Sequence, residues 1–149
     1  MPTVMIRPVR PSDEAAWRTL FDGYTRFYDR EPVRELTAHT WRRVLDEASP
    51  VFAIVAENEA GEVVGMANAV LHESTSATTP MCYLQDLFVD PAARAGGIGG
   101  LLIDWLRAET AARGWSALYW HTRENNYRAR ALYDRYTPHS GFLRYVLRS

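Results

Sequence analysis

Apolar residues follow two spacings along the chain, and the spacing predicts which segments are strands and which are helices. Short apolar or alternating runs between turn residues predict strands at residues 4–9, 51–57, 62–71, 81–89, 116–121 and 142–147. Apolar residues at three- and four-residue steps predict helices from an N-cap at Ser12 to Tyr28 and over residues 33–47, 98–113 and 126–136. The predicted order is therefore strand, two helices, three strands, helix, strand, helix and strand.

The composition is typical of one soluble globular domain. A chain of 149 residues can bury a single sizeable core, so we expect one domain over residues 1–149. With 23% charged residues and a formal net charge of −1, nothing in the electrostatics favours nucleic acid or an anionic membrane as a partner. Cys82 is the only cysteine, and no apolar run is long enough for a signal peptide or a membrane span. We therefore expect a cytoplasmic protein.

The turn between the strand at 81–89 and the helix at 98–113 is rich in glycine. Gly96, Gly97, Gly99 and Gly100 stand where a helix begins, although glycine weakens helices. A backbone that must pass close to a ligand explains them better than helix formation does. Free N–H groups at a helix start favour an anion, so a phosphate or pyrophosphate is the expected ligand.

Spacing separates the known types of phosphate loop. A Walker loop needs Lys and then Ser or Thr after its last glycine, whereas Leu101 follows Gly100 here. A dinucleotide-binding loop needs Gly or Ala at position 102, which is Leu. The pattern R-x-x-G-x-G is met by Arg94, Gly97 and Gly99. The alternative is a glycine-rich connection that binds no ligand.

A second motif lies downstream, where N-x-x-A-x-x-L-Y is met by Asn126, Ala129, Leu132 and Tyr133. With the R-x-x-G-x-G turn and the predicted order of elements, it resembles the GNAT family of N-acetyltransferases. The segments YLQDLFVDP and WHTRENNYRARALY look closest to the subgroup of fungal histone and D-amino-acid acetyltransferases and their bacterial relatives. The resemblance implies a mixed, mostly antiparallel sheet that is splayed at the cofactor site and flanked by about four helices.

The resemblance also implies acetyl-coenzyme A as the acetyl donor and assigns residues to its binding. The backbone of one strand segment pairs with the pantetheine arm, the glycine-rich turn donates N–H groups to the pyrophosphate with Arg94 adding charge, and the last helix contacts the arm. The residues concerned are Leu87, Phe88, Val89, Arg94, Ala95, Gly96, Gly97, Ile98, Gly99, Gly100, Asn126, Ala129 and Tyr133. Alternatively, Asn126 is only a helix cap and Tyr133 only a core aromatic residue.

Two residues are candidates for the proton transfers of such a reaction. Tyr133 is the candidate general acid, because a tyrosine pKa of about 10 lies near that of a thiol. Asp86 is the candidate base, directly or through water, unless it only orders the site. Gln85 cannot accept a proton, and strand alternation places it on the face opposite Asp86. The N–H group of Phe88 is a candidate to polarise the thioester oxygen.

The acceptor side is expected near Tyr24, Phe27, Tyr28 and Glu31, with Gln85 contributing from the strand. Aromatic rings beside carboxylates suit a cationic amine with an apolar stem, but they also suit core aromatics beside a solvated turn. The four histidines lack the spacing of metal ligands, so no metal is predicted.

The sequence therefore predicts an acetyl-coenzyme A-dependent N-acetyltransferase for a small primary amine of the amino acid or polyamine type. A protein lysine or N-terminal amine is the alternative acceptor, and an acyl-coenzyme A-binding module without activity is the alternative class. The resemblance also implies a homodimer, to which the last strand often contributes. Relatives have Gly-Phe or Gly-Tyr four residues after the tyrosine, where this chain has Thr137 and Pro138.

Overall fold

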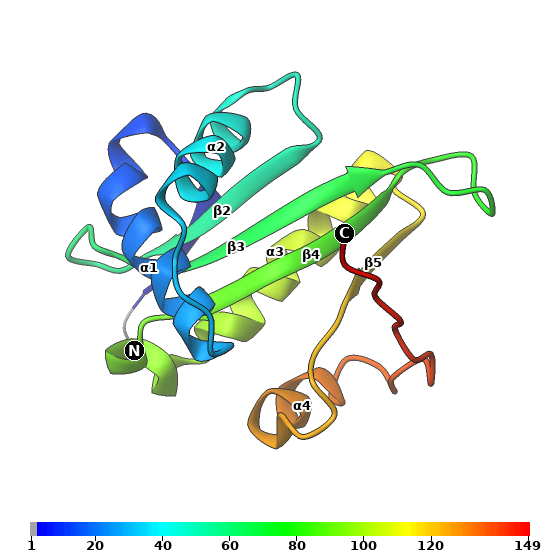
Figure 1. The fold of residues 1–149 in the computed structure, drawn as a ribbon. Helices are drawn as coiled ribbons and strands as arrows, with labels where there is room; N and C mark the ends of the chain where they lie inside the picture. Colours follow the sequence, from blue (N-terminus) through cyan, green and yellow to red (C-terminus); the bar gives the residue numbers. More distant parts are fainter. Residues whose placement is uncertain (1–2) are drawn as a thin grey trace.

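The computed structural model describes residues 3–149 as a five-stranded sheet with helices on both faces (Figure 1). The elements are β1 (Met5–Pro8), a 3₁₀ helix η1 (Pro11–Asp13), α1 (Glu14–Phe27), α2 (Arg34–Leu45), β2 (Val51–Glu57), β3 (Val63–His72), β4 (Met81–Val89), a 3₁₀ helix η2 (Pro91–Gly96), α3 (Ile98–Arg113), β5 (Ala117–Trp120) and α4 (Tyr127–Tyr133). The strand order is β1-β2-β3-β4-β5, antiparallel except for the parallel β4–β5 pair. The expected mixed, mostly antiparallel sheet is confirmed.

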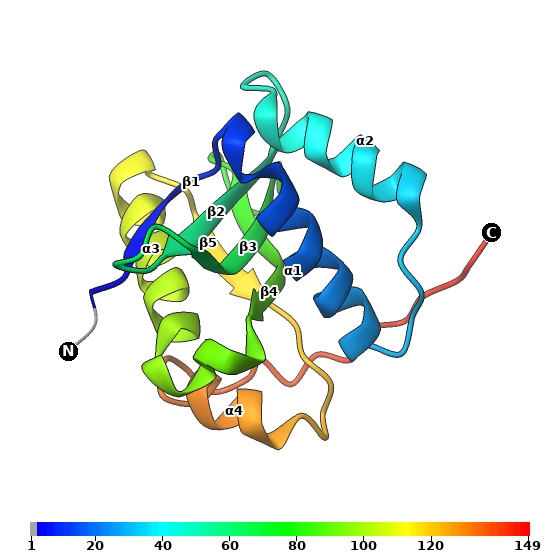
Figure 2. The same ribbon diagram turned by 90° about the vertical axis from the view of Figure 1, so that its left-hand side faces the viewer.

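Each face of the sheet carries its own hydrophobic core. α1 and α2 cover one face and α3 covers the other, as Figure 2 shows with the sheet between them. Because side chains alternate along a strand, β2 serves both cores. Its Val55 packs in the core with Trp17 of α1, and its Ile54 packs in the core with Leu102 of α3. None of the helices within residues 3–149 is both long and apolar enough to cross a membrane.

The pairing of β4 changes at Gln85. β5 pairs with β4 only as far as Leu84. On the other side, β3 pairs with Leu84 and then with Asp86, which leaves Gln85 as an extra residue, a β-bulge. Between Gln85 and Val89, no strand of the described chain pairs with the edge of β4 that faces β5. The sheet is therefore open at this end, as the resemblance implies.

Local sequence signals predict most of the elements well. β2, β4 and α3 have the predicted bounds, and β1, α1, α2, β3, β5 and α4 differ from theirs by at most three residues at each end. The 3₁₀ helices η1 and η2 were not predicted. Gly61 in the β2–β3 hairpin and Gly114 after α3 have positive φ angles of 79° and 71°, as expected for a tight turn and a helix C-cap.

The predicted strand at residues 142–147 is wrong. These residues form no regular element, and their large apolar side chains are 79% to 101% exposed at Phe142, Leu143, Tyr145 and Leu147. A strand is stable only where a neighbour satisfies its backbone N–H and C=O groups, and no neighbour does so within residues 3–149. An apolar run alone is therefore not sufficient to form a strand.

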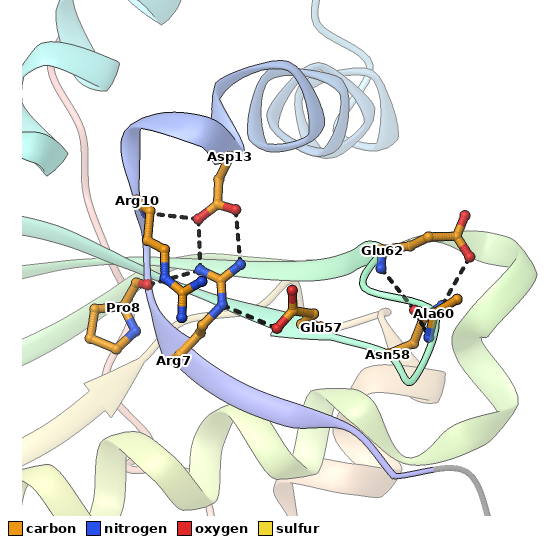
Figure 3. Close-up of polar contacts among 8 residues, drawn as sticks. All are labelled: Arg7, Pro8, Arg10, Asp13, Glu57, Asn58, Ala60 and Glu62. Atoms are coloured by element: carbon orange, nitrogen blue, oxygen red, sulfur yellow. Dashed lines mark hydrogen bonds and ion pairs between the residues drawn. The ribbon is translucent and has the colours of Figure 1, made fainter.

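An ion-pair network joins β1, β2 and the start of α1 (Figure 3). Arg7 donates to both carboxylate oxygens of Asp13 at 2.8 and 2.9 Å, and to Glu57 at 3.4 Å. Asp13 Oδ2 also accepts from the backbone N–H of Arg10 at 2.7 Å. The side chain that bonds to the backbone where the first helical segment begins is therefore that of Asp13, and not that of the predicted N-cap Ser12. The Arg7 and Asp13 side chains are 9% and 5% exposed. The hydrogen bond from Arg7 lowers the pKa of Asp13.

Replacing Asp13 by Asn leaves the Arg7 charge buried without its main partner. We expect Asp13→Asn to lower the free energy of unfolding by about 3 kcal/mol at pH 7. Because the folded-state pKa of Asp13 lies below its ordinary value of 3.8, wild type has this stability at higher pH and loses it as the pH falls below that value. Urea unfolding should therefore show a difference between wild type and variant that shrinks in acid.

The pair between the half-buried Glu109 and the exposed Arg113 on α3 provides the control for this measurement. Glu109→Gln should change the free energy of unfolding by less than about 0.5 kcal/mol, because exposed ion pairs contribute little. Equal effects of the two substitutions would contradict the role assigned to Asp13.

Candidate functional site

A cleft of about 630 Å³ lies where the sheet is open, between β4, the start of α3 and α4. Most residues predicted to bind the acyl donor gather in its lining, which includes Leu87, Phe88, Val89, Arg94, Gly97, Ile98, Gly99, Gly100, Asn126, Ala129 and Tyr133. Ala95 and Gly96 belong to η2 and are not part of this lining. Residues from two motifs far apart in the sequence thus share one cavity.

The start of α3 presents unpaired N–H groups to this cleft. Gly97 has a φ of 70° and precedes the helix, whose first backbone bond runs from the N–H of Leu101 to the carbonyl of Gly97. The N–H groups of the three residues between them therefore have no partner within the helix. Together with the helix dipole, they favour an anion in the cleft.

The glycines at the start of α3 are not all explained by the protein's own packing. Gly97 needs glycine for its positive φ. At Gly99 and Gly100, an added Cβ would lie 3.5 Å from its nearest neighbours, Leu132 Cδ2 and Tyr136 Oη, which is ordinary contact. Since Ala would fit there and would favour the helix, a ligand that approaches the backbone explains these two glycines better.

Arg94 braces the turn against the end of β4. Its Nε donates to the carbonyl of Val89 at 3.2 Å. Its guanidinium lies 5.2 Å from the ring centre of Phe88 and 6.0 Å from that of Phe27. The side chain therefore positions the turn as well as bringing a positive charge to the cleft wall.

The register of β3 and β4 determines which backbone groups of β4 face the open edge. The N–H of Asp90 donates to the carbonyl of Val64 at 2.8 Å, in line with the pairing of Met66 with Phe88. Hydrogen-bonded and non-hydrogen-bonded pairs alternate in an antiparallel ladder, so Phe88 bonds to β3. Leu87 and Val89 then turn their N–H and C=O groups toward the open edge. They are better placed than Phe88 to bond a ligand there.

Asp86 is held by a chain of hydrogen bonds from α1. The indole N–H of Trp17 donates to Asn68 Oδ1 at 2.9 Å, and Asn68 Nδ2 donates to Asp86 Oδ2 at 3.0 Å. Because an indole can only donate, it fixes the orientation of the Asn68 amide. Burial raises the pKa of Asp86, although its hydrogen bonds act in the opposite direction. A carboxylate with a raised pKa is a stronger base.

The bulge changes the simple alternation expected for Gln85 and Asp86. As the extra residue, Gln85 separates Leu84, in the α3 core, from Asp86, which bonds to Asn68 toward α1. Gln85 is exposed, and its carbonyl accepts from the hydroxyl of Tyr24 at 3.2 Å. Tyr24 therefore joins α1 to the bulge beside Asp86. Burial, followed by the charge of Asp86, raises the pKa of Tyr24, so its hydroxyl keeps its proton.

Tyr133 lies in the cleft wall on α4. Its ring contacts Trp120 of β5, with ring centres 5.6 Å apart. Burial raises the pKa of Tyr133 to about 12. The ordinary value of 10 assumed from the sequence is thus too low for this site. The hydroxyl holds its proton firmly, and it transfers the proton readily only to a thiolate that is itself poorly solvated.

The predicted acceptor residues do not all meet. Phe27 and Tyr28 line the cleft, and the Tyr28 ring contacts those of Tyr24 and Phe27 with centres 5.0 and 5.2 Å apart. Glu31 is exposed in the α1–α2 connection and is absent from the lining. Phe27 and Tyr28 are therefore at the site. The other predicted acceptor and catalytic residues outside α4 are not part of this lining: Tyr24, Glu31, Gln85 and Asp86.

Several lining residues were not predicted from the sequence: Leu101, Asp104, Arg128, Arg135 and Tyr136. Leu132, which belongs to the second motif but was given no role in binding, also lines the cleft. Arg128 and Arg135 lie four positions before and three positions after the motif residue Leu132, a helical spacing that would have identified the two arginines. Asn126 donates its side-chain amide to Thr122 at 3.0 Å and makes no side-chain cap, so it is not simply a helix cap. The two arginines add positive charge where the helix start favours an anion.

Comparison with known proteins identifies the class to which this fold and cleft belong. The chain matches the Acetyltransferase (GNAT) family over residues 14–137. It is 29% identical to the D-amino-acid N-acetyltransferase HPA3 of Saccharomyces cerevisiae over 133 residues, which are 89% of this chain and 83% of that protein. It is 31% identical to the uncharacterized N-acetyltransferase YhfO of Bacillus subtilis over 144 residues, 95% of each.

A solved structure agrees with the sequence relatives. The fold superposes on the aminoglycoside N-acetyltransferase AAC(6')-Iy in complex with CoA, with a TM-score of 0.82, 17% identity, and coverage of 100% of this chain and 96% of that one. The chain therefore belongs to the GNAT family of acetyltransferases and is an acyltransferase. The resemblance to the fungal D-amino-acid acetyltransferases and bacterial relatives is confirmed.

Substitution at Gly99 separates stability from ligand binding. Because a Cβ fits there and Ala favours the helix, we expect Gly99→Ala to leave the melting temperature unchanged or slightly raised. The same methyl group would push an anion away from the helix start and weaken coenzyme A binding about tenfold, as measured by calorimetry. Gly114→Ala, at the positive-φ position after the same helix, should lower stability and leave the affinity unchanged. Unaltered affinity in Gly99→Ala would contradict the anion site.

Proposed function

We propose that the protein transfers an acetyl group from acetyl-coenzyme A to the primary amine of a small molecule of the amino acid or polyamine type. The observation that carries this proposal is the cleft at the open end of the sheet, whose lining includes Tyr133 and Leu87, the residue that follows Asp86 on β4. Asp86, with its raised pKa, stands on β4 just after the bulge, and Tyr133 stands in the wall of the cleft beside β4. A reaction that removes one proton and delivers another needs two such groups.

The donor would lie along the open edge of β4. Its pantetheine amides would bond to the backbone of Leu87 and Val89, as an added strand does. Its pyrophosphate would sit on the N–H groups at the start of α3, near the charges of Arg94, Arg128 and Arg135. This arrangement would bring the thioester toward Tyr133.

In the reaction, the neutral amine attacks the thioester carbonyl carbon and a new C–N bond forms. The amine proton passes to Asp86, directly or through water, and the C–S bond of the tetrahedral intermediate breaks. The departing thiolate takes a proton from the Tyr133 hydroxyl, and solvent returns one to the tyrosinate. A backbone N–H at the open edge, that of Leu87 or Val89, would stabilise the oxygen of the intermediate.

The choice of acceptor rests on the relatives and on the aromatic wall. HPA3 is named for D-amino acids and AAC(6')-Iy for aminoglycosides, both of which are small amines. Phe27 and Tyr28 offer an apolar wall for the stem of such an amine. A protein lysine remains the rival acceptor. Gln85 at the bulge cannot accept a proton, but membership of a family of acetyltransferases disfavours a binding module without activity.

We also propose that this single domain forms a homodimer and acts in the cytoplasm. The apolar side chains at 142–147 are exposed, and within residues 3–149 the outer edge of β5 has no strand partner. A second copy would cover both features, because an extended segment can add a strand to an open edge. The single cysteine, Cys82, is buried and unpaired, as suits a reducing compartment.

Thiol release measured over a panel of amines tests the proposed reaction. We expect acetyl-coenzyme A to release thiol at a rate that depends on the concentration of an amino acid or a polyamine. The product should be heavier than that amine by one acetyl group, about 42 Da. Binding of coenzyme A without amine-dependent release would favour the binding module. Acetylation of a lysine peptide in preference to every small amine would favour the protein acceptor.

Two variants test the roles proposed for Tyr133 and Asp86. Tyr133→Phe should lower kcat about 100-fold with little change in coenzyme A affinity. Asp86→Asn should lower kcat/KM by a similar factor and remove the part of the acidic limb that Asp86 causes, leaving the part caused by protonation of the amine. Because burial raises the pKa of Asp86, that limb should lie above the ordinary aspartate value in wild type. An unchanged rate in either variant would remove that residue from the mechanism.

Light scattering tests the dimer. We expect a mass of twice 17.0 kDa for the full chain and a monomer after removal of residues 141–149. Tyr145→Arg should weaken the dimer in the same direction, because this side chain is 89% exposed in the single chain and would be covered in the pair. A monomeric full chain at high concentration would refute this assembly.

A further inference from the structure

Two connections from opposite walls of the cleft meet at Arg123, in the segment between β5 and α4. Its guanidinium lies 5.0 Å from the ring centre of Tyr28. Its Nη1 lies 3.8 Å from Asp29 Oδ2, and its Nη2 donates to the Tyr28 carbonyl at 3.4 Å. Tyr28 and Asp29 follow directly after α1, 95 and 94 positions before Arg123 in the chain.

The backbone at the end of α1 is shaped to make this contact. Asp29 has a φ of 57° and is the single non-glycine residue with a positive φ within residues 3–149. Its N–H donates to the carbonyl of Arg26 at 2.9 Å, which ends the helix in a tight reversal. Such a conformation is uncommon outside glycine, and Asp is among the residues that tolerate it best.

The bridge lies next to the reacting end of the cleft. Tyr28 lines the cleft beside Phe27, and Tyr28 and Tyr133 are close enough for Tyr28 to act on the pKa of Tyr133. In Figure 2, the carboxyl end of α1 and the segment leading into α4 lie at the same end of the sheet. Arg123 therefore links the wall formed by α1 to the wall formed by α4.

The three contacts are individually weak. The Arg123 and Asp29 side chains are 56% and 88% exposed, so water and salt screen their ion pair. A cation that is itself exposed, over a half-buried ring such as that of Tyr28, also contributes little. Their sum favours the closed bridge by about tenfold, so it opens often and does not act as a permanent crosslink.

We propose that Arg123 is a positioning residue that holds Tyr28 over the thioester end of the cleft and so slows release of the acyl donor and entry of water. This inference rests on the proposed binding of acetyl-coenzyme A in the cleft. While the bridge is closed, Tyr28 covers the thioester. When it opens, the donor can leave, or water can attack the thioester carbon to give acetate and the free thiol.

Arg123→Ala tests this role. We expect coenzyme A to dissociate about three- to tenfold faster in stopped-flow experiments, and acetyl-coenzyme A to release thiol without amine about three- to tenfold faster. Arg123→Lys should raise both rates less than Arg123→Ala does, since lysine keeps the positive charge and lacks only the planar guanidinium. Asp29→Asn should give a smaller increase, because it removes the ion pair and retains the cation over the ring. Raising the salt concentration should narrow the difference between wild type and Arg123→Ala.

Arg113→Ala removes an exposed arginine of a distant ion pair and serves as the matched control. It should leave both rates unchanged, and both alanine variants should melt within a few degrees of wild type. If Arg123→Ala binds coenzyme A and both rates equal those of wild type, the positioning role is wrong and the proposed function stands. If neither protein binds coenzyme A, the proposed function itself fails. If Arg123→Ala does not fold, the other two variants decide. Coenzyme A dissociation at the wild-type rate from both Asp29→Asn and Arg123→Lys would refute the positioning role of Arg123.

Discussion

The site depends on one interruption in backbone pairing. β4 loses β5 as a neighbour after Leu84, and a bulge at Gln85 marks the same point on its other side. A strand normally has its N–H and C=O groups satisfied by neighbours, because unpaired groups that are shielded from water are costly. Here the groups of Leu87 and Val89 remain turned outward along the cleft. This edge of β4 can therefore form backbone hydrogen bonds with an extended ligand that has amides of its own.

The same interruption gives Asp86 its place. Without an extra residue at Gln85, strand alternation would place Asp86 on the same face as Leu84, toward the core under α3. With it, Asp86 meets Asn68, and Asn68 is fixed by the indole of Trp17, which is fully buried in the core under α1. A carboxylate at the open end of the sheet is thus anchored to the core under α1. Its raised pKa follows from that burial.

The sequence predicted what local signals determine. β4 and α3 were placed correctly because apolar spacing, Asp90–Pro91 and Gly114 all agree over a few residues. The motif residues were placed in one cleft by family resemblance.

What the sequence did not predict depends on distant partners. The bulge at Gln85 arises from pairing with β3, and the contact of Arg123 with Tyr28 joins positions 95 apart. The raised pKa of Tyr133 reflects burial by elements far along the chain. The segment at 142–147 has an apolar pattern, but pattern alone supplies no neighbouring strand.

The open edge of β4 has a further consequence for how such proteins diverge. Main-chain amides are the same whatever side chains a lineage acquires, so the proposed binding of the donor by Leu87, Val89 and the start of α3 would survive extensive mutation. The opposite wall consists of side chains such as Phe27 and Tyr28, which change with every substitution. A common donor with varied acceptors is the expected evolutionary outcome. Relatives at 29% and 31% identity, one named for D-amino acids and one for aminoglycosides, fit that outcome.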